Sequence, residues 1–174
     1  MQIFYASREG QSRRIAERIA ARLTAQDTPA VLHDLAAGDV RDRDGLAVLV
    51  APVRYGKHLP EAERFLAGFQ GRDAPLVFLS VNLTARKPGK QSAETNQYLL
   101  KALLRHKLKP LLAEAIAGRL DYPRYGWLDR TMIRLIMKMT GGPTDPTAVV
   151  EYTDWNRVDA IADEIAQLER QPAR

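Results

Sequence analysis

The segment Gln2-Ile3-Phe4-Tyr5-Ala6-Ser7-Arg8-Glu9-Gly10-Gln11-Ser12 decides the fold of this chain. Its first five residues predict a buried strand, and the residues after Ser12 follow the pattern of an amphipathic helix. The turn between them carries two hydroxyl groups and Gly10, which allows a close approach to the backbone. Because a helix N-terminus offers unpaired N–H groups and the positive end of the macrodipole, this arrangement predicts a phosphate-binding loop.

The turn has neither the glycine spacing of a dinucleotide-binding fingerprint nor the Gly-Lys-Ser/Thr of a P-loop. It resembles instead the FMN-phosphate loop of flavodoxins, in which hydroxyl residues flank a glycine. The alternative is an ordinary strand-to-helix turn in which Ser12 or a neighbour caps the helix.

The composition limits the classes of protein. The chain has 174 residues, 45% of them hydrophobic, which suits one domain with its own core over residues 1–174. It contains no Cys, which excludes a thiol nucleophile, a Cys-ligated metal site and any disulfide. It begins directly with a strand and has no apolar run of about 20 residues, so we expect a cytoplasmic protein without a signal peptide.

The net charge of +5 favours an anionic partner, which includes nucleic acid, anionic lipid and an acidic small molecule. No nucleic-acid-binding motif is evident in the sequence, so we do not expect nucleic acid as the partner.

Apolar runs alternate with helical patterns along the chain. We expect strands at 2–6, 30–35, 46–53, 75–81 and 111–117, and helices at 12–25, 60–69, 92–108, 127–139 and from 155 onward. Continuous apolar runs suit strands that are covered on both faces. The pattern predicts a flavodoxin-like α/β fold, a doubly wound five-stranded parallel sheet in the order 2-1-3-4-5. Ligands then bind at the carboxyl ends of the first, third and fourth strands.

Two loops are expected at that end of the sheet. The first contains Tyr55, an aromatic residue that can stack on a planar ring, next to the cationic Arg54. In the second, Asn82 and the backbone can meet the polar edge of a flavin. The alternative for both is turn chemistry with solvated charge. The candidate cofactor-binding residues here are Pro52, Val53, Arg54, Tyr55, Gly56, Ser80, Val81, Asn82, Leu83 and Arg86.

The three histidines do not have metal-ligand spacing, so we expect no metal. His58 lies in the first of these loops and is the candidate for moving a proton, although a lone histidine more often has a structural role. The sequence indicates no other catalytic residue.

The stretch 120–150 does not fit the five-strand plan, and it predicts an insertion of about thirty residues between the fifth strand and the last helix. Residues 127–139 predict a helix with a cationic stripe beside an apolar flank. Such a helix is typical of a membrane interface and also suits a flat, hydrophobic dianion. The alternative is a helix packed on its own sheet with an exposed basic ridge. The candidate substrate- or membrane-binding residues are Arg124, Tyr125, Arg130, Arg134 and Lys138.

Several stretches together resemble the bacterial menaquinone-dependent protoporphyrinogen IX dehydrogenases, a family of short flavodoxin-like enzymes of haem biosynthesis. The stretches that carry the resemblance are 80–88, 122–125, Asp129-Arg130 with Met132-Ile133, 135–139, Gly141-Gly142 and 152–155. Arg54-Tyr55-Gly56 and the phosphate loop fit as well, so the resemblance covers essentially the whole chain. Ordinary flavodoxins lack the basic, Met-rich helix.

The resemblance implies an oxidoreductase that uses FMN to remove six electrons from protoporphyrinogen IX and passes them to menaquinone. It also implies peripheral attachment to an anionic membrane, at the inner face of the cell membrane. Carried over by position, the residues for the FMN phosphate are Ser7, Arg8, Glu9, Gly10 and Gln11, with Ser12 adjacent. The candidate partners of the substrate propionates are Arg54, Arg86, Arg124, Arg130, Arg134 and Lys138.

Three other functions stay open at this point. They are an NAD(P)H:quinone reductase, a flavodoxin-type electron carrier, and a flavin-free domain that binds nucleic acid or lipid. A homo-oligomer is also left open, because flavodoxin-like enzymes often assemble.

Overall fold

The computed structural model describes residues 1–38, 45–70 and 75–170. Five parallel strands form a sheet in the order β2-β1-β3-β5-β6, which is the order predicted from the sequence. A two-residue strand, β4 (Lys57–His58), turns back antiparallel onto the end of β3. The five parallel strands are β1 (Gln2–Tyr5), β2 (Val31–Asp34), β3 (Ala47–Arg54), β5 (Leu76–Val81) and β6 (Leu112–Ile116).

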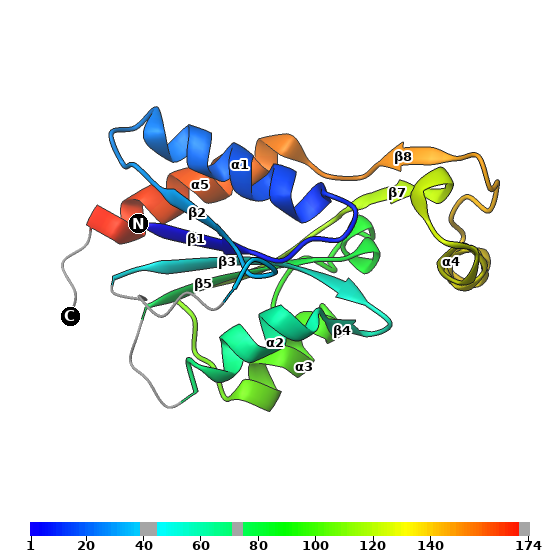
Figure 1. Cartoon of the computed structure of the whole chain (residues 1–174), viewed down its shortest axis with the longest axis horizontal. Helices are drawn as coiled ribbons and strands as arrows, with labels where there is room; N and C mark the ends of the chain where they lie inside the picture. The colour runs from blue at the N-terminus through cyan, green and yellow to red at the C-terminus, as the bar shows by residue number, and fades with distance from the viewer. Residues whose placement is uncertain (39–44, 71–74, 171–174) are drawn as a thin grey trace.

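Helices cover both faces of the sheet (Figure 1). α1 (Gln11–Thr24) and α5 (Trp155–Arg170) lie on one face, and α2 (Pro60–Ala67) and α3 (Gln97–His106) lie on the other. Because successive side chains of a strand point to opposite faces, each face has its own apolar core. Ile3 packs into the core under α1 and α5, whereas its neighbour Phe4 packs with α2 and α3.

Two helix starts are fixed by side-chain caps. The helix predicted over 92–108 begins only at Gln97, because the amide oxygen of Asn96 accepts a hydrogen bond from the backbone N–H of Leu99 at 3.3 Å. The last helix begins where the sequence predicts it. The carboxylate of Asp154 accepts from the backbone N–H of Arg157 at 3.1 Å.

The insertion between β6 and α5 forms a small structure of its own. It contains β7 (Arg119–Asp121), the short 3-10 helix η2 (Tyr122–Arg124), α4 (Trp127–Met139) and β8 (Val149–Glu151), which pairs antiparallel with β7. α4 has the bounds predicted from the sequence. Buried Leu120, Tyr122 and Met137 form its core.

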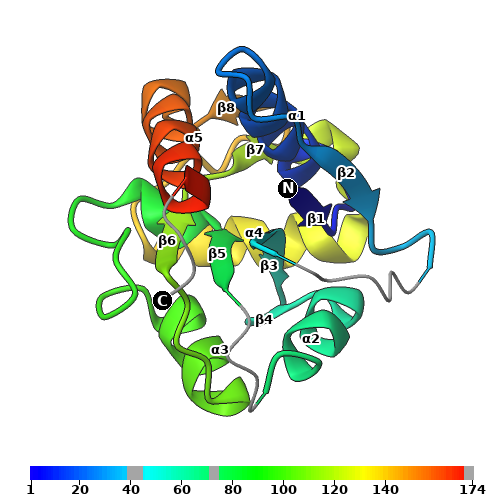
Figure 2. The ribbon, with the colours of Figure 1, turned by 90° about the vertical axis from the view of Figure 1, so that its left-hand side faces the viewer.

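α4 is placed across the carboxyl ends of the parallel strands, as Figures 1 and 2 show from two directions. A second 3-10 helix, η1 (Leu83–Arg86), follows β5 at the same end of the sheet. Within the described residues, no helix has both the length and the apolar character needed to cross a bilayer.

Candidate functional site

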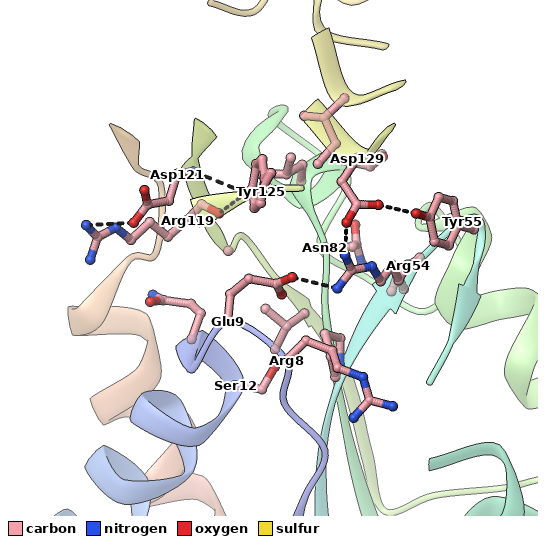
Figure 3. Close-up of a pocket in the computed structure, with 18 of the residues that line it drawn as sticks. Arg8, Glu9, Ser12, Arg54, Tyr55, Asn82, Arg119, Asp121, Tyr125 and Asp129 are labelled. Atoms are coloured by element: carbon pink, nitrogen blue, oxygen red, sulfur yellow. Dashed lines mark hydrogen bonds and ion pairs between the residues drawn. The ribbon is translucent and has the colours of Figure 1, made fainter. Parts of the chain in front are cut away.

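A cavity of about 490 Å³ lies between the carboxyl ends of the strands and the insertion. Figure 3 shows side chains from the loop after β1, the β3–β4 turn, the loop after β5 and the insertion converging on it. Of the residues predicted to bind the cofactor, those that line the cavity are Ser7, Arg8, Glu9, Gln11, Ser12, Pro52, Val53, Arg54, Tyr55, Gly56, Val81, Asn82, Leu83 and Arg86. From the insertion, Arg124 and Tyr125 line it as well.

Other predicted site residues lie elsewhere. Ser80 is fully buried in β5 beneath the cavity. Gly10 is the N-cap of α1 and is not among the lining residues. The cations Arg130, Arg134 and Lys138 do not line the cavity either.

The loop after β1 is shaped to present its backbone. Gly10 has a φ of 91°, a left-handed conformation that favours glycine, and a Cβ added there would meet open space. The hydroxyl of Ser7 accepts a hydrogen bond from the backbone N–H of Gly10 at 3.1 Å. No described side chain caps α1, so the alternative in which Ser12 is the cap is wrong. The first N–H groups of α1 are therefore available to an anion.

The charged side chains of this loop are bound to partners outside it. The guanidinium of Arg8 pairs with Glu61 of α2 at 2.9 Å, and the carboxylate of Glu9 pairs with Arg54 of β3 at 2.6 Å. Both charges are compensated by these pairs. The loop itself offers N–H groups and hydroxyls rather than a free charge.

Arg54 and Tyr55 also bind the insertion. Tyr55 and Gly56 both have positive φ, 51° and 79°, which is typical of a tight hairpin turn between β3 and β4. The turn directs the guanidinium of Arg54 and the hydroxyl of Tyr55 to the carboxylate of Asp129 on α4 (Figure 3). The hydrogen bond to this carboxylate raises the pKa of Tyr55.

Asp129 was not among the residues singled out for the site from the sequence. Its signal is that it is the one acidic residue in a helix whose other charges are Arg130, Arg134 and Lys138. An acid in such a helix favours a contact with a cation from another element.

Buried polar side chains form a hydrogen-bonded network around Asn82. His58 Nε2 lies 2.8 Å from Ser80 Oγ, which also accepts from the amide of Asn82 at 3.1 Å. The oxygen of Asn82 accepts from the amide of Asn96 at 3.1 Å. Because His58 is buried, its pKa is lowered to about 4. His58 does not line the cavity, and its contact with Ser80 gives it a structural role in holding the loop after β5.

The cations and the apolar residues of α4 lie in different places from those expected for a helix whose cations meet substrate or membrane. Arg130 donates to the carbonyls of Tyr122 and Tyr125 at 3.2 and 3.3 Å, and Arg134 donates to the carbonyl of Thr144 at 2.9 Å. These cations are therefore held against the backbone of the insertion. Three apolar residues of α4 line the cavity, namely Met132, Ile133 and Ile136. Among the large apolar residues of α4, the most exposed are Trp127, Leu128, Leu135 and Met139.

The chain matches the family of flavodoxin domains over residues 2–147. It is 41% identical over 175 residues to a protoporphyrinogen IX dehydrogenase [quinone] of Escherichia coli K12, covering 98% of this chain and 96% of the relative. It is 35% identical to a protein of the same name from Leishmania major, covering 95% of this chain and 74% of that protein.

Solved flavodoxins share the fold. A short-chain flavodoxin associated with a bacterial microcompartment aligns with a TM-score of 0.57 at 13% identity, covering 97% of each chain. Flavodoxin 1 of Bacillus cereus aligns with a TM-score of 0.55 at 10% identity, covering 95% of this chain and 96% of that one. The flavodoxin domain indicates a flavin, FMN, as the cofactor, as predicted.

Proposed function

Because the chain belongs to the flavodoxin-like family of protoporphyrinogen IX dehydrogenases [quinone], which are oxidoreductases, we propose that it oxidises protoporphyrinogen IX to protoporphyrin IX. FMN is the resident cofactor, and a membrane quinone, menaquinone, is the acceptor. The observation that carries the proposal is that the 41% identity extends over 98% of the chain. It therefore includes the insertion, whose helix α4 closes one side of the cavity.

The residues present fit FMN. The loop after β1 supplies the uncapped N-terminus of α1 and the hydroxyls of Ser7 and Ser12, which suit a phosphate. The flavin ring is assigned to the two loops after β3 and β5, where Tyr55 and Asn82 line the same cavity. When bound, a flavin accepts two electrons at a time from an organic substrate. The hydrogen bonds of Asn82 with Ser80 and Asn96 fix the loop against which the flavin ring would lie.

The substrate is a flat, apolar tetrapyrrole with two propionates, and the cavity offers both kinds of contact. Met132, Ile133 and Ile136 give it an apolar side. Arg86 is held by the carbonyl of Leu83 and the hydroxyl of Thr140, each at 2.8 Å. Since these acceptors are neutral, they do not compensate the positive charge of the Arg86 guanidinium, which can therefore pair with a carboxylate. Arg86 is therefore our candidate partner of a propionate.

The overall reaction sets what the site must do. Protoporphyrinogen IX loses six electrons and six protons in becoming protoporphyrin IX, and three quinones take them up as three quinols. Each of the three two-electron oxidations therefore removes two hydrogen atoms from the substrate. The protein has to hold the tetrapyrrole and exclude water while this happens. This fits a cavity that no histidine lines within the described part of the chain, His58 included.

The exposed face of α4 is our candidate for membrane contact. Trp127 and Leu128 are 76% and 60% exposed, which is unusual for large apolar side chains in water. Such residues, together with the net charge of +5, suit the interface of an anionic bilayer. We place the protein at the inner face of the cell membrane, where a lipid-soluble quinone is within reach of the cavity.

An anaerobic assay tests this function. FMN-loaded protein in mild detergent receives protoporphyrinogen IX, and protoporphyrin fluorescence is followed with and without a menaquinone analogue. Sustained fluorescence increase that needs both FMN and quinone supports the proposal. No increase, with flavin demonstrably bound, overturns it. Flavin reduction by NADPH alone would then favour a quinone reductase, and a stable one-electron state without turnover would favour an electron carrier.

A further inference from the structure

Arg124 is a residue of the insertion that reaches back to the loop after β1. It lies 115 positions along the chain from Glu9, yet its guanidinium donates to the backbone carbonyl of Glu9 at 3.0 Å. It also lines the same cavity as Ser7 and Ser12. The insertion therefore places a cation directly beside the loop that is assigned to the FMN phosphate.

The charge of Arg124 is uncompensated, unlike that of its neighbours. Arg8 pairs with Glu61, Arg14 with Glu151 and Arg54 with Glu9 and Asp129. Within 1–38, 45–70 and 75–170, by contrast, Arg124 is found in no ion pair, and its partner is a neutral carbonyl. A guanidinium has five N–H donors, so one bond to a carbonyl leaves others for an anion.

The neighbouring carboxylate does not cancel this charge. Glu9 is the one acidic residue in the loop, and its side chain is bound to Arg54 at 2.6 Å rather than to Arg124. The loop and Arg124 together thus combine the N-terminus of α1, two hydroxyls and one free positive charge. Helix N-termini, hydroxyls and an arginine are donors that suit a phosphate dianion.

We propose that Arg124 binds the phosphate of FMN, so that the insertion completes the cofactor site as well as closing the cavity. Arg124 was expected from the sequence to meet substrate or membrane, and this inference gives it a different ligand. It rests on the FMN cofactor of the proposed function, and it is independent of whether the substrate is protoporphyrinogen IX.

The test compares two flavins that differ in the phosphate. The full-length apoprotein is titrated with FMN and with riboflavin, and the dissociation constant of each is read from the quenching of flavin fluorescence. Arg124→Gln keeps an N–H donor for the carbonyl of Glu9 but removes the charge. We expect it to weaken FMN binding about 10- to 100-fold and riboflavin binding less than about threefold. Arg124→Lys keeps the positive charge but lacks the paired N–H donors of a guanidinium, so it should lose less FMN affinity than Arg124→Gln.

Arg130→Gln is the matched control, because Arg130 is also held by carbonyls of the insertion but does not line the cavity. It should leave the ratio of FMN to riboflavin affinity unchanged. Equal weakening of both flavins by Arg124→Gln, or no weakening of FMN, would overturn the inference. If the unsubstituted protein binds neither flavin, the cofactor assignment itself is wrong, which is a separate result.

Discussion

The guanidinium of Arg54, at the end of β3, is in ion-pair contact with the carboxylate of Asp129 on α4, 75 residues further along the chain. The same guanidinium binds Glu9 of the loop after β1. Arg54 thus joins the two halves of the candidate site, the sheet edge and the insertion. Because both carboxylates approach one cation, loss of either partner changes how firmly α4 is held over the cavity.

Replacing Asp129 with Asn should therefore loosen α4 without unfolding the sheet. The side chain of Asp129 is only 14% exposed, so the contact is shielded from water and should contribute about 1–3 kcal/mol to closure of the insertion. We expect hydrogen exchange of the backbone amides of 127–139 to become about 10-fold faster or more. Asp145→Asn is the control, since Asp145 is exposed and contacts Thr147 of its own loop. Unchanged exchange in α4 would contradict a closing role for Asp129.

The buried His58 should make stability depend on pH. Burial lowers the pKa of His58 from about 6.5 to about 4, so the unfolded chain binds more protons between these values. The free energy of unfolding therefore rises with pH across this window, and the contribution of neutral His58 is complete above about pH 6.5 and lost toward pH 4. His58→Gln should remove up to about 3 kcal/mol of this dependence.

Urea unfolding at several pH values between 4.5 and 7.5 measures the effect. His33→Gln is a suitable control, because His33 stacks on Phe4 away from Ser80. A variant at His58 that keeps the full pH dependence would show that other groups cause it, among them Glu63, whose pKa is lowered by its hydrogen bonds to His106 and Arg105 despite partial burial.

Asn96 should be costly to remove. It is fully buried, caps α3, and donates to Asn82 at 3.1 Å and to the carbonyl of Lys90 at 2.9 Å. Asn96→Ala removes the cap of α3 and leaves the backbone N–H of Leu99 without its side-chain acceptor, while Asn82 keeps its bonds to Ser80 and Ala85. We expect a loss of about 2–4 kcal/mol in the free energy of unfolding. FMN affinity should fall as well, since Asn82 lines the cavity. Asn156→Ala on exposed α5 surface is the control, and a similar small effect of both would refute the role of Asn96.

The outer face of α4 should bind membranes. The double variant Trp127→Ser, Leu128→Ser removes two exposed apolar side chains, and binding to vesicles of anionic phospholipid should fall about 10-fold or more. Leu100→Ser, Leu104→Ser removes two exposed apolar side chains from α3 instead and should bind as before. Vesicle flotation measures both. If the two double variants behave alike, α4 is not the docking surface.

Local patterns in the sequence predicted the elements well. The strand order and the bounds of α4 follow from apolar runs and helical spacing, which are local properties. The turn between β1 and α1 could be placed for the same reason, because a strand, a turn and a helix are contiguous there. Ser80 does not line the cavity, and its place in the apolar run 75–81 was the sign that it is buried in β5, so its contact with the cofactor stays a prediction.

Contacts between distant segments could not be predicted. Nothing in the spacing of Arg130 and Arg134 indicates that they bind carbonyls of their own insertion and leave Trp127 exposed. Likewise, the bonds of Arg54 to Asp129 and of Arg124 to Glu9 depend on how the insertion folds back over the sheet. Such pairings are tertiary, and the residues that make them look like solvated surface charge in the sequence alone.

The most direct test of the central claim is a single-turnover reaction without a quinone. FMN-loaded protein is mixed anaerobically with a small amount of protoporphyrinogen IX, and flavin absorbance and protoporphyrin fluorescence are followed together. The account predicts loss of the flavin absorbance together with protoporphyrin formation, with about three flavins reduced for each porphyrin, since six electrons leave the substrate and a flavin takes two. A flavin that stays oxidised with protoporphyrinogen IX, and is reduced by NADPH instead, would contradict it.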